Sequence, residues 1–339
     1  MRFHTAPSPH LALPTSVPLI MKRVLLALLP GTAALTWLFG IGVVTNVLLS
    51  IGFCAAAEAT VLRMRRRPVN LFLGDFSAVV TGWLLGLSLP PLSPWWLILI
   101  ACVFAIVVAK QVYGGLGYNP FNPAMVGYVV VLISFPVDMT AWLAPGDTGL
   151  GLLDSLSAVF TGAVSGIDGA TAATALDIVK TEVEFGRMIS EFSTRPAFGL
   201  LGGAGVEWAA AFFMAGGIWM VYMRTTNWQI PASTLIALFL SAAAFWALDP
   251  EAYASPLFHL FSGGAMLGAF FIATDPVSAC TTPRGRLFFG AGVGIITYVI
   301  RTWGGYPDGV AFAVLLMNLM APTIDHYTRP RVLGHEAKR

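Results

Sequence analysis

Long apolar segments separated by short polar ones constrain this chain more than any other feature of its sequence. An α-helix needs roughly 20 apolar residues to cross the hydrocarbon core of a bilayer. Hydrophobic residues make up 57% of the chain and charged residues only 11%, whereas about 25% of the residues of a soluble domain are charged. An integral membrane protein is therefore predicted, and a soluble enzyme, a disordered chain and a coiled coil are excluded. Candidate spans lie at 24–40, 42–62, 76–92, 94–112, 123–137, 197–222, 230–248, 260–275, 286–302 and 307–325.

Basic residues are distributed unequally between the segments that connect these ten spans. If the N-terminus is cytoplasmic, 15 of the 19 Lys and Arg residues fall on the cytoplasmic side and four on the other side. This asymmetry is typical of the positive-inside rule, and with ten spans it places both termini in the cytoplasm. The four outward basic residues are Lys180, Arg187, Arg195 and Arg301.

The longest hydrophilic interruption contains eight of the 17 acidic residues and is predicted to face outward. Five parts follow along the chain: a Pro-rich cytoplasmic tail without the apolar core of a signal peptide, five helices, the outward segment, five further helices and a basic cytoplasmic tail. Their ranges are 1–23, 24–137, 138–196, 197–325 and 326–339.

The two groups of five helices resemble each other weakly in sequence. Residues 76–91 align with 261–276, and residues 119–138 align with 306–325. Because each group has an odd number of spans, the two groups must lie in the membrane with opposite orientations. The predicted fold is therefore all-α, a polytopic membrane protein of about ten transmembrane helices in two inverted five-helix repeats. Inverted repeats are typical of transporters, in which paired short, Gly-rich and Pro-ended spans line the functional site.

One outward run, from Ile167 to Asp177, consists mostly of small and hydroxyl-bearing residues. Its composition predicts an exposed turn that leads into a helix capped by Thr174 or Asp177.

Six ionisable residues are predicted at membrane depth, where charges are costly and usually pair or mark an ion path. Glu58 lies in an apolar helix near its cytoplasmic end, and Asp275 ends a short span, so both are candidates for an ion path. The alternative is structural pairing, for example of Glu58 or Asp75 with the arginines at 63–67. The full set is Glu58, Asp75, Lys110, Asp275, Arg301 and Asp308.

The sequence Asn-Pro-Phe-Asn-Pro at 119–123 opens a short span on the cytoplasmic side. Its prolines leave backbone carbonyls unpaired, and the carboxamides of Asn119 and Asn122 offer hydrogen-bond donors and acceptors. Two interpretations remain open, a helix start capped by asparagine and a ligand pocket. Residues 304–309 are the outward counterpart and are predicted to form a helix break.

The three cysteines lie far apart in apolar stretches of the sequence. Their spacing excludes a disulfide framework, and it excludes an iron–sulfur or zinc site built by this chain alone. We expect Cys54, Cys102 and Cys280 to be buried packing residues.

Five blocks of the sequence together are similar to the RnfD (RsxD) subunits of the Rnf ion-translocating electron-transport complex, in the NqrB/RnfD family. They are YGGLGYNPFNPAMVGYVVVLISFP, the Thr-x-Ala-Thr element, MLGAFFIATDPVSACTTPRGRL, GGYPDGVAFAVLLMN and TRPRVLGH. The likeness covers nearly the whole chain. The short N-terminal tail and the TRPRVLGH ending favour RnfD over NqrB, so no quinone site is expected. Ala172 stands where NqrB-like elements have Gly, and Ala175 where Pro is common.

In this family a flavin transferase joins FMN through a phosphoester to the last threonine of an (S/T)-x-A-T element. The resemblance therefore implies covalent FMN on Thr174, with Thr171 in the leading position and Asp168 holding the loop or the metal of the transferase. It also implies a second, non-covalent flavin, riboflavin, with Asn119 and Asn122 as its candidate contacts.

The resemblance further implies a bacterial inner-membrane subunit that carries electrons between reduced ferredoxin and NAD and takes part in Na⁺ or H⁺ translocation. Because the chain lacks a Rossmann glycine fingerprint and a ferredoxin-type cysteine run, nucleotide oxidation and iron–sulfur transfer would belong to partner subunits. The implied partners are RnfA, RnfB, RnfC, RnfE, RnfG, the flavin transferase and the lipid bilayer, with no nucleic acid, and the subunit is not catalytic alone. The alternatives are a non-redox secondary transporter or channel with the same repeats, and a passive scaffold.

Overall fold

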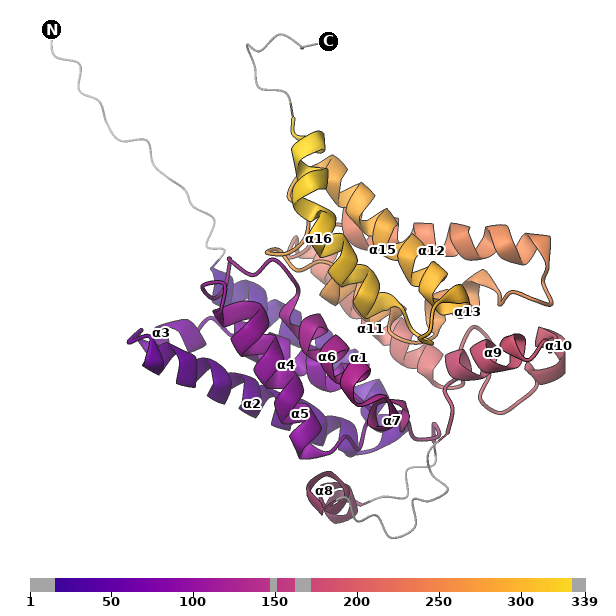
Figure 1. Ribbon diagram of the computed structural model, residues 1–339, viewed down its shortest axis with the longest axis horizontal. Coiled ribbons are helices and arrows are strands. Elements are labelled where there is room, and N and C mark those ends of the chain that lie inside the picture. The colour runs from indigo at the N-terminus through magenta and orange to yellow at the C-terminus, as the bar shows by residue number, and fades with distance from the viewer. Residues whose placement is uncertain (1–15, 147–150, 162–171, 331–339) are drawn as a thin grey trace, which may run out of the picture.

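The computed structural model describes residues 16–146, 151–161 and 172–330 (Figure 1). These residues are mostly helical, and the β-pairing found among them is an isolated bridge between Phe198 and Gly203. The predicted all-α class is confirmed for this part of the chain. Two predicted site residues, Thr171 and Asp168, lie outside the described residues.

Among the described residues, four helices are long and apolar enough to cross a membrane. At 1.5 Å per residue, the 23 residues of α1 extend about 35 Å, more than the roughly 30 Å of a hydrocarbon core. Large apolar side chains such as Trp37, Leu240 and Phe288 point outward from the helices and are exposed. The chain is therefore a multi-pass membrane protein. The four helices are α1 (Val17–Phe39), α2 (Gly42–Met64), α12 (Gln229–Leu248) and α16 (Val310–Thr328).

The other helices that carry predicted apolar segments are shorter or more polar. The helix α15 (Pro283–Trp303) is long but carries arginines near both ends. The segment predicted at 260–275 is broken into three pieces, which leaves backbone groups without helical partners. The elements are α4 (Ser77–Ser88), α5 (Trp95–Val103) continued by the π-helix η1 (Phe104–Gln111), α6 (Pro123–Ser134), α11 (Val206–Tyr222), α13 (Pro256–Phe261), α14 (Ala265–Leu267) and the π-helix η2 (Gly268–Ile272).

Three helices begin with the same local sequence, a capping side chain followed by proline. The side chains of Asn122, Ser255 and Thr282 each accept a hydrogen bond from the backbone three residues later. The proline that follows each of them has no N–H to satisfy and a φ suited to the first helical position. The predicted asparagine-capped helix start at 122 is therefore confirmed.

The helices form two bundles that lie side by side, one from α1 to α7 (Pro136–Thr140) and one from α11 to α16 (Figure 1). In the first bundle α2 contacts α4 and α5, and η1 contacts α6; in the second, α12 contacts α13 and α15, and α15 contacts α16. The bundles meet where α1 packs on α11 and α6 on α16. Four short helices complete the described chain: α3 (Val69–Leu73), α8 (Leu152–Thr161), α9 (Ala175–Glu184) and α10 (Ile189–Phe192).

Glycines allow α1 and α11 to approach each other closely. A Cβ atom on Gly216 of α11 would overlap the carbonyl oxygen of Ala27, and one on Gly31 of α1 would overlap the ring of Phe213. Small residues at such crossings favour helix packing in membranes. The contact that joins the two bundles therefore depends on the absence of side chains at both positions.

Cysteine packing differs in one respect from the sequence interpretation. All three cysteines are free and buried, as expected. However, Cys54 of α2 and Cys102 of α5 are neighbours in the first bundle, and Cys102 Sγ donates to the Ser50 carbonyl of α2 at 3.5 Å. Their distance along the sequence conceals this proximity, which comes from the packing of α2 against α5.

We expect Gly86→Ala to destabilise the protein by about 1–3 kcal/mol, the usual effect of overpacking. A Cβ atom at Gly86 of α4 would lie 2.7 Å from the Cα of Val47 on α2. Gly52→Ala in α2 is the matched control, because a Cβ there meets nothing within 4 Å and alanine favours helix. Unfolding of the detergent-solubilised variants measures both effects. Equal stability of the two variants would contradict the close packing of α4 on α2.

Candidate functional site

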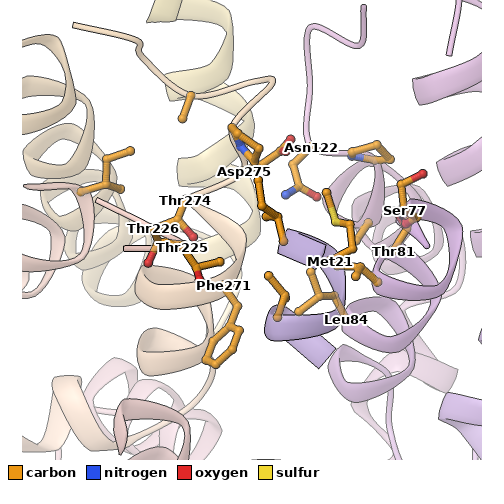
Figure 2. Close-up of a pocket in the computed structure, with 18 of the residues that line it drawn as sticks. Met21, Ser77, Thr81, Leu84, Asn122, Thr225, Thr226, Phe271, Thr274 and Asp275 are labelled. Carbon is orange, nitrogen blue, oxygen red and sulfur yellow. Dashed lines mark hydrogen bonds between the residues drawn. The ribbon is translucent and has the colours of Figure 1, made fainter. Parts of the chain in front are cut away.

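In the part of the chain that the structure describes, residues of both bundles come together around two cavities. The first, here called the asparagine cavity, encloses about 190 Å³ and is lined by Asn119, Asn122 and residues of α1, α4, η1, α11, η2 and α15. Figure 2 shows Thr225, Thr226, Thr274 and Phe271 on one wall and Met21, Ser77, Thr81 and Leu84 on the facing wall, with Asn122 and Asp275 between them. The cavity therefore brings together several of the residues singled out in the sequence.

Several polar atoms in the asparagine cavity are buried without a hydrogen-bond partner. They are the carboxamide oxygen of Asn119 and the hydroxyl oxygens of Thr225 and Thr226. Buried polar atoms are nearly always hydrogen-bonded, so unpaired ones need an explanation such as a bound water or ligand. The cavity is thus chemically suited to a polar ligand. The two threonines were not identified from the sequence, where they appear only as a short polar stretch after α11.

Asn119 and Asn122 have different roles in the structure. The Asn122 carboxamide caps α6 by accepting from Met125 N, and its Nδ2 donates to the Ile272 carbonyl at the end of η2 (3.1 Å). The backbone N–H of Asn122 donates to Asn318 Oδ1 of α16. Asn122 therefore links the two bundles, whereas Asn119 donates to Phe121 O and leaves its own oxygen free in the cavity.

A buried ion pair lies at one side of the asparagine cavity. Lys110 Nζ is 2.7 Å from Glu58 Oε1 and donates to Ser77 Oγ at 2.7 Å, and Gln111 Nε2 donates to Glu58 at 2.7 Å. The Lys110 and Glu58 side chains are 2% and 3% exposed. A buried charge needs a partner because removing it from water is costly. The proposed pairing of Glu58 with the arginines at 63–67 is therefore wrong: Glu58 pairs with a lysine 52 residues away.

The other two carboxylates on this side are held by local hydrogen bonds. Asp75 accepts from the backbone N and the hydroxyl of Ser77, so its suggested pairing with the arginines is also wrong. Asp275 accepts from Ser278 Oγ at 2.7 Å and from Val277 N, and no Lys or Arg among the described residues forms an ion pair with it. Asp275 and Lys110 both line the cavity, so it contains an acid and a base that are not paired with each other.

The second cavity, here called the threonine cavity, encloses about 340 Å³ and is lined by Thr174 and Asp177. Its volume is within the range of about 300–1,000 Å³ typical of small-ligand sites. The walls come from both bundles and are rich in aromatic rings. These rings belong to Phe39, Tyr128, Trp142, Phe213 and Tyr306.

Thr174 is the N-cap of α9, as one of the two sequence alternatives predicted. Its side chain accepts from Asp177 N, and the Asp177 carboxylate accepts from Thr174 N at 3.0 Å and from the Thr174 hydroxyl at 2.5 Å. The nearby backbone is held to the cavity wall, because Ala172 N donates to the Trp142 carbonyl at 2.8 Å. The Thr174 hydroxyl is thus fixed at the edge of the aromatic cavity.

Charged side chains fix the far wall of the threonine cavity. Arg301 is buried and donates to Asp308 Oδ1 at 3.1 Å and to the carbonyls of His259 and Ser262. Asp308 also accepts from Gly264 N at 2.7 Å. These bonds satisfy backbone groups at the break between α13 and α14, so Arg301 and Asp308 both have a structural role here. For Asp308 this agrees with the structural role predicted for residues 304–309.

On α9 itself, Lys180 donates to the Gly304 carbonyl. Burial lowers the pKa of Lys180, and the neighbouring carboxylates of Glu184 and Asp177 oppose that shift. Lys180 therefore attaches α9 to the end of α15 beside the threonine cavity.

The chain also matches known proteins over nearly its whole length. The sequence model of the NQR2, RnfD, RnfE family matches residues 4–334. The chain belongs to this family. Three relatives are named as the D component of an ion-translocating oxidoreductase complex. The chain is 49% identical to the one from Escherichia fergusonii, over 99% of both chains. It is 55% identical to the one from Ectopseudomonas mendocina and 53% identical to one from Pseudomonas aeruginosa, in both cases over 97% of this chain and 95% of the relative.

Removing one partner of the Glu58–Lys110 pair should lower the free energy of unfolding more than removing both partners. Lys110→Met leaves Glu58 buried and unpaired, which should lower the free energy of unfolding by about 3–5 kcal/mol. The double variant with Glu58→Met should recover part of this loss, because apolar residues replace both charges. Unfolding in detergent of the wild type, both single variants and the double variant gives the coupling energy. Additive losses would show that the two charges do not interact.

Proposed function

We propose that this chain is the membrane subunit of an ion-translocating ferredoxin:NAD oxidoreductase complex and carries two flavins, one in each cavity. The observation that carries this proposal is the position of Thr174, whose hydroxyl lies at the edge of a large aromatic cavity. The names of its relatives support the complex and the ion translocation as the setting. The subunit would act together with RnfA, RnfB, RnfC, RnfE and RnfG, and would not be catalytic alone.

The threonine cavity suits FMN joined through its phosphate to Thr174. A phosphate on this hydroxyl lies at the N-terminus of α9, where free backbone N–H groups and the helix dipole stabilise an anion. Aromatic rings on the cavity walls suit a planar ring system. Thr171 and Asp168 remain proposals for the leading position of the attachment element and for holding its loop.

The asparagine cavity suits the polar ring of riboflavin. Asn119, Thr225 and Thr226 offer unpaired polar atoms there, and Asn122 holds the wall between the two bundles. The cavity's 190 Å³ is below the usual range for such sites, so we propose that the bundles separate slightly to admit the whole ligand.

An aromatic contact joins the two cavities. Phe213 lines the threonine cavity and Phe271 lines the asparagine cavity, and their rings pack edge to face with centroids 6.0 Å apart. Flavins bound in the two cavities would supply the electron transfer, because redox chemistry belongs to the cofactor. The side chains of this subunit would hold the rings at the two ends of this aromatic contact and exclude water between them.

We further propose ten membrane spans in two inverted repeats, with both termini in the cytoplasm of a bacterium and the subunit in its inner membrane. Some helix pairs correspond between the two bundles: α2 contacts α4 and α5 as α12 contacts α13 and α15, and α5 contacts α6 as α15 contacts α16. The short spans also begin alike, with positive φ at Phe76 (63°) and at Gly263 (62°). On this arrangement Thr174 lies on the outer side and Asn119 on the cytoplasmic side.

Exposure of Thr174 to a flavin transferase should yield a chain that remains fluorescent after denaturing electrophoresis. Thr174→Val should be dark in the gel and should still release one non-covalent riboflavin on denaturation. Asn119→Ala should stay fluorescent in the gel but should release no riboflavin on denaturation, because it changes only the asparagine cavity. Thr60→Val, which removes an exposed hydroxyl bonded to its own helix, is the control for loss of a threonine.

The outcomes of this experiment separate the competing functions. Fluorescence in Thr174→Val would eliminate the acceptor assignment. A wild-type chain without any flavin would favour the secondary transporter or channel, which shares the repeats but has no redox chemistry. Intact ferredoxin-to-NAD electron flow in Thr174→Val would favour a passive scaffold.

For the ion path we propose Asp275, which lines the asparagine cavity, and Glu58, which pairs with the cavity residue Lys110. Either Na⁺ or H⁺ can be held by such oxygen atoms. In the complex reconstituted into vesicles, Glu58→Gln and Asp275→Asn should greatly reduce the ion gradient while ferredoxin-to-NAD electron flow continues. The exposed Asp249→Asn is the matched control. If both variants assemble normally and build a full gradient, these residues are not on the path.

A further inference from the structure

The hydroxyl proton of Thr174 is already directed at a carboxylate. Thr174 Oγ1 donates to Asp177 Oδ2 at 2.5 Å, and the same carboxylate oxygen accepts from Thr174 N at 3.0 Å. In return, Asp177 N donates to Thr174 Oγ1 at 3.2 Å. The reactive oxygen is therefore fixed in position from two sides.

A capping box alone does not require this third contact. A capping box needs two hydrogen bonds. The hydroxyl oxygen of the N-cap residue accepts from the backbone N–H three residues later, and the acidic side chain there accepts from the backbone N–H of the N-cap residue. The hydroxyl proton is free to rotate toward any other acceptor. The 2.5 Å separation from Asp177 is typical of a hydroxyl that donates to a carboxylate, about 2.5–2.7 Å. The threonine therefore has a proton acceptor in direct contact, as general-base catalysis needs.

We propose that Asp177 is the general base for attachment of the flavin to Thr174. This inference rests on the proposed function, in which Thr174 is the acceptor. The donor would be a flavin dinucleotide presented by the transferase. Thr174 Oγ attacks the phosphorus of the flavin phosphate as its proton passes to the Asp177 carboxylate. The new Oγ–P bond forms, the diphosphate P–O bond breaks, and the nucleoside monophosphate leaves with the electron pair. Asp177 then returns the proton to solvent, and nothing is oxidised or reduced.

The surrounding groups leave Asp177 available for this role. On its own helix, Lys180 donates to the Gly304 carbonyl and Glu184 is exposed. On the elements packed against α9, Arg301 of α15 is bonded to Asp308, and Glu191 of α10 is exposed.

Across the cavity, Asp308 is bonded to Arg301 and Gly264, and Tyr128 is another ionisable lining residue. Among the described residues, no Lys or Arg forms an ion pair with Asp177. Its carboxylate is therefore free to accept the hydroxyl proton.

The rate of flavin attachment tests the proposal. The full-length chain would be purified without flavin from a host that lacks the transferase, then mixed with saturating purified transferase and FAD, and gel fluorescence would be followed with time. Asp177→Asn keeps an oxygen that can accept from Thr174 N, so the cap remains, but it removes the base. We expect kcat for attachment to fall about 100-fold or more, the usual contribution of a general base. Asp177→Glu should recover part of the rate, and Glu184→Gln should match the wild type.

The pH dependence separates a base from a structural or docking residue. The ratio of the wild-type rate to the Asp177→Asn rate should decrease toward one as the pH is lowered, because a protonated carboxyl accepts no proton. A role in docking alone would raise KM and leave kcat and this ratio unchanged, which would overturn the inference. An Asp177→Asn chain labelled as fast as the wild type would also overturn it. Failure to label the wild type, or labelling of Thr174→Val, would instead refute the proposed function.

Discussion

Backbone groups at membrane depth need hydrogen-bond partners from the protein itself, and this constraint organises the whole structure. Lipid offers no partner for the free N–H and C=O groups that a broken helix leaves. Here side chains from distant segments provide them. The side chains of three asparagines donate to backbone carbonyls: Asn122 to that of Ile272, Asn318 to that of Ser278 and Asn46 to that of Pro90. Arg301 donates to the backbone carbonyls of His259 and Ser262. The Asp308 carboxylate accepts from the backbone N–H of Gly264. Each bond crosses between elements, so the same contacts that satisfy the broken backbone also fix the helices relative to one another.

The cavities follow from this arrangement. Short helices cannot fill the space between two bundles along their full length, and the close contact of α1 with α11 at Gly31 and Gly216 divides the remaining space. The asparagine cavity has buried polar atoms without hydrogen-bond partners, whereas the threonine cavity has aromatic walls and the helix-capping hydroxyl of Thr174 at its edge. The Phe213–Phe271 contact lies between them. Under the proposed function, the threonine cavity would be the modification site and the asparagine cavity the polar binding site.

Those features of the candidate site that depend only on neighbouring residues in the sequence could be predicted from it. Thr174 and Asn122 cap helices because short polar side chains before a helix satisfy its first N–H groups, and this depends only on neighbouring residues. The pairing of Glu58 was not predictable in this way. The arginines at 63–67 are near it in sequence, but Lys110 is near it in space, because α2 packs against the helix formed by α5 and η1. The proximity of Cys54 to Cys102 was missed for the same reason, and the free hydroxyls of Thr225 and Thr226 acquire significance only beside Asn119.

The sequence by itself determined the all-helical membrane class, the family and the helix starts, because hydropathy, composition and capping act over a few turns of chain. Tertiary structure alone decided which charges pair, which asparagine links the bundles and which keeps a free oxygen, and where Thr174 lies relative to an aromatic cavity. These outcomes depend on which helices are neighbours across tens or hundreds of residues. Burial then determines the result, since a charge or polar atom removed from water must find whichever partner the packing brings within reach.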